Sequence, residues 1–177
     1  TGVRKFWGTQ ATQDLGQDDE LLKLMYKAGC RVVLYGLESI NPEVLSGVNK
    51  RFNKVEDFKV NIRNTQRHGI AVIGSFVFGF DSDDPDAFDA TVRFIKKSRL
   101  AAQNLNLLCP FPGTRIFNKF LQSGRLRYVN FPEDWERYTL KDAVINPKKG
   151  SALELYIRRR DAEYALNNIP MLAQRTF

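Results

Sequence analysis

Four strand-like runs, each followed by a helical pattern, constrain the fold of this chain most strongly. The runs begin near residues 3, 31, 70 and 103, and each leads into a segment whose apolar residues lie three to four apart. Two of the runs, 31–37 and 70–80, are almost continuously apolar, which is typical of strands buried on both faces of a parallel sheet. Strand–helix units in series therefore predict an α/β chain with a parallel sheet.

The length limits how much of a barrel such units can build. A closed eight-stranded (β/α) barrel needs about 250 residues, whereas this chain has 177. We therefore predict a partial (β/α) barrel of about four parallel strands with outer helices over residues 1–124. Right-handed crossovers place those helices on one side of a curved sheet or on both sides of an open one. Beyond residue 124 the periodicity is lost, and residues 125–177 are predicted to form a mainly helical C-terminal extension.

Composition and charge narrow the protein class. The hydrophobic content of 43% and the charged content of 27% are ordinary for a globular chain. A net charge of +7 suits nucleic acid, anionic lipid or an anionic cofactor, but a basic tail explains it as well, and we favour the tail because 158–160 is an arginine run. The sequence contains no run of eighteen apolar residues that would predict a transmembrane helix. The first residues lack a leader and a methionine, so we expect the chain to begin mid-protein.

Polar residues stand at the carboxyl ends of the expected strands. They are Gln10, Glu38, Ser39, Ser75 and Asp81. Ligands of parallel sheets bind at this edge, and burying polar groups is costly unless they find partners. Four strands ending this way predict a polar rim that forms a ligand site. A carboxylate at position 38 suits hydrogen bonds from an amine or from ribose hydroxyls, although capping a helix or pairing with residue 50 or 51 are alternatives.

Other chemically suggestive residues have simpler explanations. Gly74 inside a strand indicates close approach by a ligand or by another chain segment, or a bulge. The acidic residues at 81, 83, 84 and 86 resemble a divalent-metal cluster, but they lack the glycine and terminal glutamate of a calcium loop, so we favour helix capping by Asp83 or Asp84. His68 is the only histidine and stands at a helix end, so the sequence has almost no histidine ligands for a zinc site. We predict no metal ligands in the chain.

An ordered set of motifs resembles a known family. The set comprises WGTQ at 7–10, residues 19–30, GLESIN at 36–41, residues 49–50, residues 68–70, GSFVFGFD at 74–81 and PFPGT at 110–114. Together these motifs resemble the second half of the barrel of radical S-adenosylmethionine enzymes. The most similar subgroup is the one associated with a cobalamin-binding domain, which includes anaerobic cyclases and methylating enzymes. The resemblance covers about residues 3 to 128.

The resemblance implies cofactor contacts at individual positions. By motif matching, Gln10 lies near the methionine moiety of S-adenosylmethionine and Glu38 faces the cofactor, with Ser39 beside it. Ser75 matches a position that faces the ribose. Lys50 matches a basic position that contacts the carboxylate or ribose region of the cofactor, and Val77 matches a position that flanks the adenine. Pro110 and Phe111 match the loop on the adenine side.

One departure from the family pattern matters. The family's 4Fe-4S cluster is held by three cysteines in a C-x3-C-x2-C loop, and that loop is absent here, because the two cysteines are Cys30 and Cys109. We therefore expect cluster ligands and the cobalamin-binding domain to lie outside this chain. Two distant thiols also make no disulfide framework and suggest a reducing cytoplasm.

The functional hypothesis follows from the resemblance. The chain is expected to be the C-terminal portion of an enzyme that cleaves S-adenosylmethionine reductively to a 5′-deoxyadenosyl radical, with methyl transfer or cyclisation of a small-molecule substrate as the outcome. This chain alone is expected to be inactive. The alternative is a small basic α/β module that binds a nucleotide or RNA without catalysis, although we do not expect nucleic acid as a partner.

Open sheet edges carry the last expectation. Four strands taken from a barrel leave unpaired edges at residues 3–9 and 105–108, which predicts pairing with the missing N-terminal part of the barrel or self-association. The inner face is expected to be apolar through Val32, Leu34, Ile73, Phe76 and Phe78. Alternatively, the extension at 125–177 folds back over one edge, which its aromatic residues Trp135, Tyr138 and Tyr156 could cover.

Overall fold

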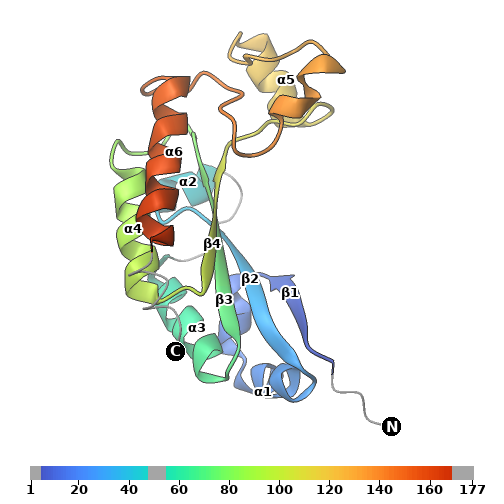
Figure 1. Ribbon diagram of the computed structural model, residues 1–177, viewed down its shortest axis with the longest axis vertical. Coiled ribbons are helices and arrows are strands. Elements are labelled where there is room, and N and C mark those ends of the chain that lie inside the picture. The colour runs from blue at the N-terminus through green and yellow to red at the C-terminus, as the bar shows by residue number, and fades with distance from the viewer. Residues whose placement is uncertain (1–4, 48–54, 169–177) are drawn as a thin grey trace.

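A computed structural model describes residues 5–47 and 55–168 of the chain (Figure 1). Strands and helices alternate through the first part, and a mixed segment follows. The strands are β1 (Trp7–Ala11), β2 (Cys30–Glu38), β3 (Ala71–Phe78) and β4 (Ala102–Leu107). The helices are η1 (Gln13–Gln17), α1 (Asp19–Lys27), α2 (Pro42–Gly47), α3 (Val55–Arg67), α4 (Ala87–Ser98), α5 (Arg115–Gln122), η2 (Glu133–Arg137) and α6 (Ala152–Asn167).

The four strands form one parallel sheet in the order β1-β2-β3-β4. One row of pairing crosses the whole sheet, from Gln10 to Leu34, Ile73 and Ala102. Each strand lies beside the next one in sequence, as expected when strand–helix units follow each other with the same handedness. The predicted partial (β/α) barrel with about four parallel strands is therefore confirmed.

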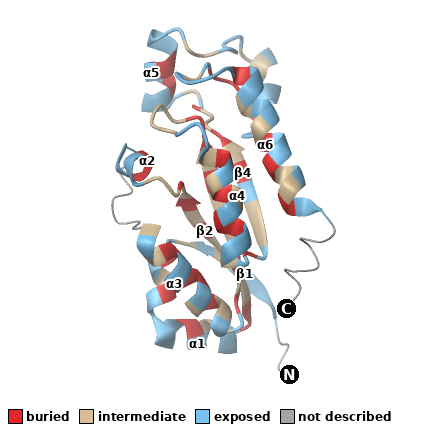
Figure 2. Ribbon diagram, turned by 90° about the vertical axis from the view of Figure 1, so that its left-hand side faces the viewer, coloured by how far each residue is buried: buried red, intermediate tan, exposed pale blue. Residues whose placement is uncertain are grey.

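The described helices cover one face of the sheet and leave the other face, here called the open face, without a helix layer (Figures 1 and 2). Every second residue of the strands is buried in a single core beneath the helices. These buried strand residues include Val33, Tyr35, Leu37, Val72, Phe76, Phe78, Leu105 and Leu107. The prediction that Phe76 and Phe78 face the open side was wrong, because their parity along β3 turns them towards the helices, where Phe78 stacks on Phe88. Val32, Leu34 and Ile73 have the opposite parity and are half-buried on the open face.

Gly74 allows the helix layer to approach β3 closely. A Cβ atom at this position would come within 2.6 Å of Leu100 Cδ1 and 3.0 Å of Phe76 Cε2. The pairing of β3 with β4 is regular here, so no bulge is present. Of the interpretations open to the sequence, close approach by another chain segment is the one that the structure supports.

The segment after α5 builds a second apolar cluster. Its buried residues are Phe117, Phe120, Tyr138, Val144 and Ile145. α5 therefore packs with residues 126–145, whereas α6 returns to the main core through Ala152, Ala162 and Leu166. The second apolar cluster therefore contains residues from both sides of the predicted domain boundary at residue 124. The division into domains at that residue stays a prediction.

The β4 edge is covered by the chain itself. Leu107 N donates to Leu140 O at 2.8 Å, and Lys141 Nζ donates to Leu105 O at 3.2 Å. Helix α6 lies along α4 and β4 (Figure 1). The expectation of two open edges was therefore wrong for β4, because the extension folds back over it, although the contacts come from residues other than the aromatic ones we expected. Among the described residues, β1 pairs only with β2.

Within the described residues, none of the helices combines the length and the apolarity that crossing a lipid bilayer requires.

Candidate functional site

Polar side chains gather on the open face of the sheet. Gln10 of β1, Ser75 of β3, and Asn104 and Asn106 of β4 have the strand parity of the open face, and all four are exposed or half-buried. Asn106 Nδ2 donates to Ser75 Oγ at 3.4 Å, which shows that adjacent strands present their polar groups side by side. Amide and hydroxyl groups in this arrangement can donate to and accept from a polar ligand.

The end of β2 is shaped by Glu38. The pairing register of β2 with β3 shifts between Gly36 and Glu38, and Glu38 has a φ of 63°. This left-handed conformation costs a residue with a Cβ about 1 kcal/mol or more, so tertiary contacts must hold it. The strained turn lies at the carboxyl edge of the sheet, where strain of this kind often accompanies function.

Ser39 lies apart from the open face. Its Oγ accepts a hydrogen bond from Asn41 N at 3.0 Å, and Asn41 Nδ2 donates to Asp84 Oδ2 at 2.9 Å. Ser39 lines a groove of about 480 Å³ bordered by Phe78 and Thr91, on the helix side of the sheet. The structure therefore separates Ser39 from Gln10 and Ser75, whereas the predicted contact at Lys50 lies outside the described residues.

The loop after β3 is anchored by Asp81. Arg125 donates to both of its carboxylate oxygens, at 2.7 and 3.1 Å, and Lys148 Nζ lies 3.3 Å from Oδ2. These hydrogen bonds from Arg125, followed by the Lys148 contact, hold the pKa of Asp81 below its usual range. Asp81 was predicted as part of the polar rim, but the structure uses it to join β3 to the extension.

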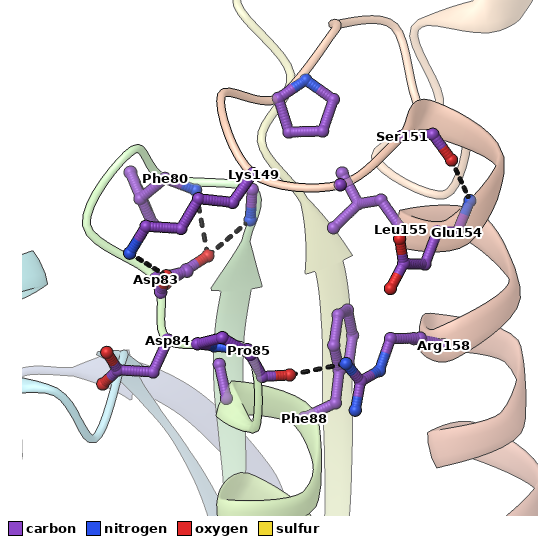
Figure 3. A pocket seen from close by; sticks show the side chains of 14 residues that line it. Phe80, Asp83, Asp84, Pro85, Phe88, Lys149, Ser151, Glu154, Leu155 and Arg158 are labelled. Atoms are coloured by element: carbon purple, nitrogen blue, oxygen red, sulfur yellow. Dashed lines mark hydrogen bonds between the residues drawn. The ribbon is translucent and has the colours of Figure 1, made fainter.

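Asp83 has a different environment in the same loop (Figure 3). Its Oδ2 accepts hydrogen bonds from Gly79 N at 2.7 Å and Phe80 N at 3.0 Å. Burial raises the pKa of Asp83 to about 6 despite these hydrogen bonds. The predicted helix capping by Asp83 or Asp84 was wrong, because Asp83 caps the turn after β3, Asp84 accepts from Asn41, and α4 begins only at Ala87.

A cavity of about 160 Å³ lies between this loop and the amino end of α6 (Figure 3). Phe88 and Leu155 supply apolar walls, and Lys149 donates from its Nζ to Asp83 O at 2.9 Å. Arg158 donates to Pro85 O, which fastens α6 to the start of α4. The cavity lies on the helix side, so it is separate from the open face.

Pro110 and Phe111 follow the carboxyl end of β4, where the resemblance placed the adenine-side loop. Pro110 is buried, while Phe111 is 39% exposed with its ring centroid 6.1 Å from that of Tyr138. Thr114 closes the loop by accepting a hydrogen bond from Phe117 N at 3.2 Å as the N-cap of α5. The loop therefore connects the sheet edge to the second apolar cluster.

The two cysteines lie on different parts of the fold. Cys30 begins β2 in the main core, and Cys109 contacts the second cluster beyond β4. Burial raises the pKa of both thiols, that of Cys109 to about 11, so neither is a thiolate near neutral pH. In residues 5–47 and 55–168, no three His, Cys, Asp or Glu side chains lie close enough together to hold a metal ion.

Sequence reasoning missed Asn104 and Asn106. The segment AQNLNL at 102–107 alternates polar and apolar residues, which indicates a strand with one face buried. With Leu105 and Leu107 in the core, the asparagines must have the opposite orientation. The alternation in the sequence could therefore have identified the face of these asparagines. In the sheet, Asn104 pairs with Ser75 of β3. Gln10, Ser75 and Val77 share this face, while Pro110 and Phe111 stand beyond its edge.

Comparison with known proteins identifies relatives of this chain. No protein-family model matches the chain. It is 34% identical over 148 residues to bacteriochlorophyllide d C-12(1)-methyltransferase of Chlorobaculum tepidum, covering 84% of this chain and 31% of that protein. It is 32% identical over 130 residues to bacteriochlorophyllide d C-8(2)-methyltransferase of the same organism, covering 73% and 28%.

A solved structure agrees with these relatives. The radical S-adenosylmethionine methyltransferase TsrM from Kitasatospora setae, with cobalamin and a 4Fe-4S cluster bound, matches with a TM-score of 0.53 and 27% identity, over 60% of this chain and 20% of that one. This chain is part of a radical S-adenosylmethionine barrel. The resemblance to the cobalamin-associated subgroup is confirmed, and this barrel part spans about a third of the length of the curated relatives that it matches.

Proposed function

We propose that this barrel part forms one wall of the S-adenosylmethionine and substrate cavity of a radical S-adenosylmethionine enzyme that methylates or cyclises a small molecule. The observation that carries the proposal is the polar open face of a four-stranded parallel sheet in a chain related to such methyltransferases. When bound, the cofactor would supply a 5′-deoxyadenosyl radical or a methyl group, and the protein supplies position and shielding.

The described residues fit the organic cofactor. Gln10, Ser75 and Asn104 offer amide and hydroxyl groups on a face that none of the described helices covers, suited to the ribose and amino-acid moieties. Val77 lies on the same face and offers an apolar contact for the adenine. Phe111 at the edge is half-exposed and would close the cavity beside them.

The described residues do not fit the iron–sulfur cluster. A 4Fe-4S cluster needs thiolate ligands that converge on one site, whereas Cys30 and Cys109 belong to separate clusters and both thiols have raised pKa values. We propose that the cluster ligands, and any cobalamin-binding domain, belong to a part of the protein outside this chain. Both cysteines are free thiols, which suits a reducing cytoplasm.

A binding experiment tests the proposal. S-Adenosylmethionine is titrated calorimetrically into a protein that contains this chain together with its cluster-binding segment. We expect Ser75→Ala to weaken binding about threefold to tenfold, the loss of one hydrogen bond. The matched control is Ser46→Ala on the exposed side of α2, which should leave affinity unchanged. Equal affinity in all three proteins, or retention on RNA that falls steeply with salt, would favour the alternative of a nucleotide- or RNA-binding module.

A further inference from the structure

A basic groove lies between the carboxyl ends of α3 and α4, at the opposite end of the sheet from the site above. It has a volume of about 600 Å³, and its lining includes five cationic side chains, which are Lys59, Arg63, Arg67, Lys97 and Arg99. All five are exposed. No acidic residue lines the groove in the described part of the chain. Nothing in the proposed reaction accounts for such a concentration of charge.

These cations have no carboxylate partner within the described part of the chain. Among the ion pairs of the described residues, none involves the five side chains. Lys59, Arg63 and Arg67 follow each other by one turn along α3, about 6 Å apart. Lys97 of α4 and Arg99, the residue that follows this helix, line the same groove. Like charges at this spacing repel each other, so an anion in the groove would relieve a cost that the fold otherwise carries.

Helix dipoles explain only part of this arrangement. Arg67 and Lys97 stand in the last turns of their helices, where a cation favours the negative end of the dipole. Lys59 and Arg63 lie one to two turns earlier, outside the range of that effect. Gln66 also donates from its Nε2 to Arg99 O at 2.8 Å and to Ser98 O at 3.3 Å, so two carbonyl groups at the end of α4 already accept a hydrogen bond. The five cations must outweigh the negative dipole ends of both helices for an anion to bind here.

The groove also contains an unused hydroxyl. Ser98 Oγ is buried and has no hydrogen-bond partner among the described residues. Ser98 is one of the residues that line the groove. A buried hydroxyl without a partner costs free energy, which a ligand oxygen would recover by accepting its proton once Ser98 turns its Oγ into the groove.

We infer that this groove binds a small, multiply phosphorylated ligand. Phosphate concentrates negative charge and several acceptor oxygens in one compact group, which suits the guanidinium and ammonium donors and the hydroxyl of Ser98. Single-stranded nucleic acid fits less well, because its binding sites stack bases on aromatic side chains and none lines this groove.

The probe is inorganic tripolyphosphate, titrated calorimetrically into the 177-residue chain. We expect the double variant Lys59→Gln with Arg63→Gln to weaken binding at least about tenfold. The matched control is Lys119→Gln with Arg115→Gln, a pair of exposed side chains of the same composition and spacing on α5, which should change affinity less than about twofold. Ser98→Ala should weaken binding several-fold at an unchanged melting temperature.

Titrations with other anionic ligands distinguish a phosphate-binding groove from a surface that attracts any anion. Citrate should bind more weakly than tripolyphosphate, and neither a single-stranded oligonucleotide nor phosphoinositide vesicles should bind more tightly. No binding of tripolyphosphate, equal losses in the two double variants, or tighter binding of citrate, oligonucleotide or vesicles would overturn the inference. None of these variants touches the open face, so the result is independent of S-adenosylmethionine binding.

Discussion

Arg125 holds Asp81 through two hydrogen bonds of 2.7 and 3.1 Å across 44 positions of sequence. The guanidinium also stacks over the ring of Phe120, with its Cζ 4.5 Å from the ring centroid, and donates from Nε to Asn146 O at 2.9 Å. One side chain therefore joins the end of β3 to α5 and to the extension. This contact connects the second apolar cluster to the sheet, together with the hydrogen bond from Leu107 N to Leu140 O.

Asp81→Ala should destabilise the fold. The substitution leaves a mostly buried guanidinium without its carboxylate, and we expect the free energy of unfolding to fall by about 1–3 kcal/mol. Urea denaturation measures this change. The control is Asp86→Ala, whose partner Arg93 forms an ion pair exposed on both sides and should contribute under about 0.5 kcal/mol. Equal losses in the two variants would show that the Asp81 contact does not join the two parts.

Asp83 should make stability depend on pH. Its pKa in the fold is about 6, above the ordinary value of 3.8, so its contribution is fully present below about pH 4 and is lost as the pH rises through 6. Relative to Asp83→Asn, the free energy of unfolding of the unsubstituted chain should therefore fall between pH 4 and 7.5, by at most about 3 kcal/mol. Denaturation of both proteins at each pH measures the difference, and a constant difference would contradict the prediction.

Glu38 offers a way to separate binding from folding. Glu38→Ala should weaken S-adenosylmethionine binding by about 1.5–3 kcal/mol, the loss of a charge-assisted hydrogen bond. Glu38→Gly is the sharper variant, because glycine adopts a φ of 63° without strain and should preserve stability. Arg99→Gly, at another residue with positive φ far from the open face, is its control. Calorimetry showing full affinity with a collapsed melting temperature would make Glu38 purely structural.

The chain alone should bind no iron–sulfur cluster. Anaerobic reconstitution with iron and sulfide, followed by visible absorption spectroscopy, is expected to show no stoichiometric cluster, because the chain lacks three converging thiolates. A stoichiometric cluster that disappears in both Cys30→Ser and Cys109→Ser would contradict this expectation and our assignment of the ligands to another segment.

Self-association of the isolated chain should involve only the β1 edge of the sheet. The extension covers β4, so we expect association of the isolated chain through the β1 side, where Phe6 is 68% exposed. Sedimentation velocity at several concentrations should show larger species that Phe6→Lys reduces. Leu24→Lys on α1, at a side chain 61% exposed, is the control and should have less effect. A monomer at all concentrations would show that the chain needs no partner at this edge.

The strand order and the type of each main element could be predicted from the sequence. Apolar runs followed by helical patterns require parallel strands with crossover helices, because each element must bury its apolar side against another. The polar residues that end the strands, such as Gln10 and Ser75, could be found for the same reason. The strand starts were less even in accuracy: β4 was expected near residue 103 and begins at Ala102, whereas the first strand was expected near residue 3 and begins at Trp7.

The faces of the strands could not be read from the apolar runs. Residues 73–78 are apolar at most positions, so the sequence does not reveal which of Phe76 and Val77 faces the helices. That choice depends on which volumes fill the space beneath α3 and α4, where Phe94 packs edge-on against Phe58 and Phe76. Only in β4 does alternation mark the faces, and it would have identified Asn104.

The sequence by itself determined that this chain builds part of a barrel with a polar edge, because period and apolarity act locally along the chain. Only the tertiary structure decided that Asp81 points to Arg125, whereas Ser39 and Asp83 accept hydrogen bonds from backbone N–H groups two to four positions away. Each of these short polar side chains takes whichever hydrogen-bond donor lies nearest in space, and for Asp81 that donor is Arg125, distant in sequence. Contacts of this kind depend on how loops return to one another, which no local pattern records.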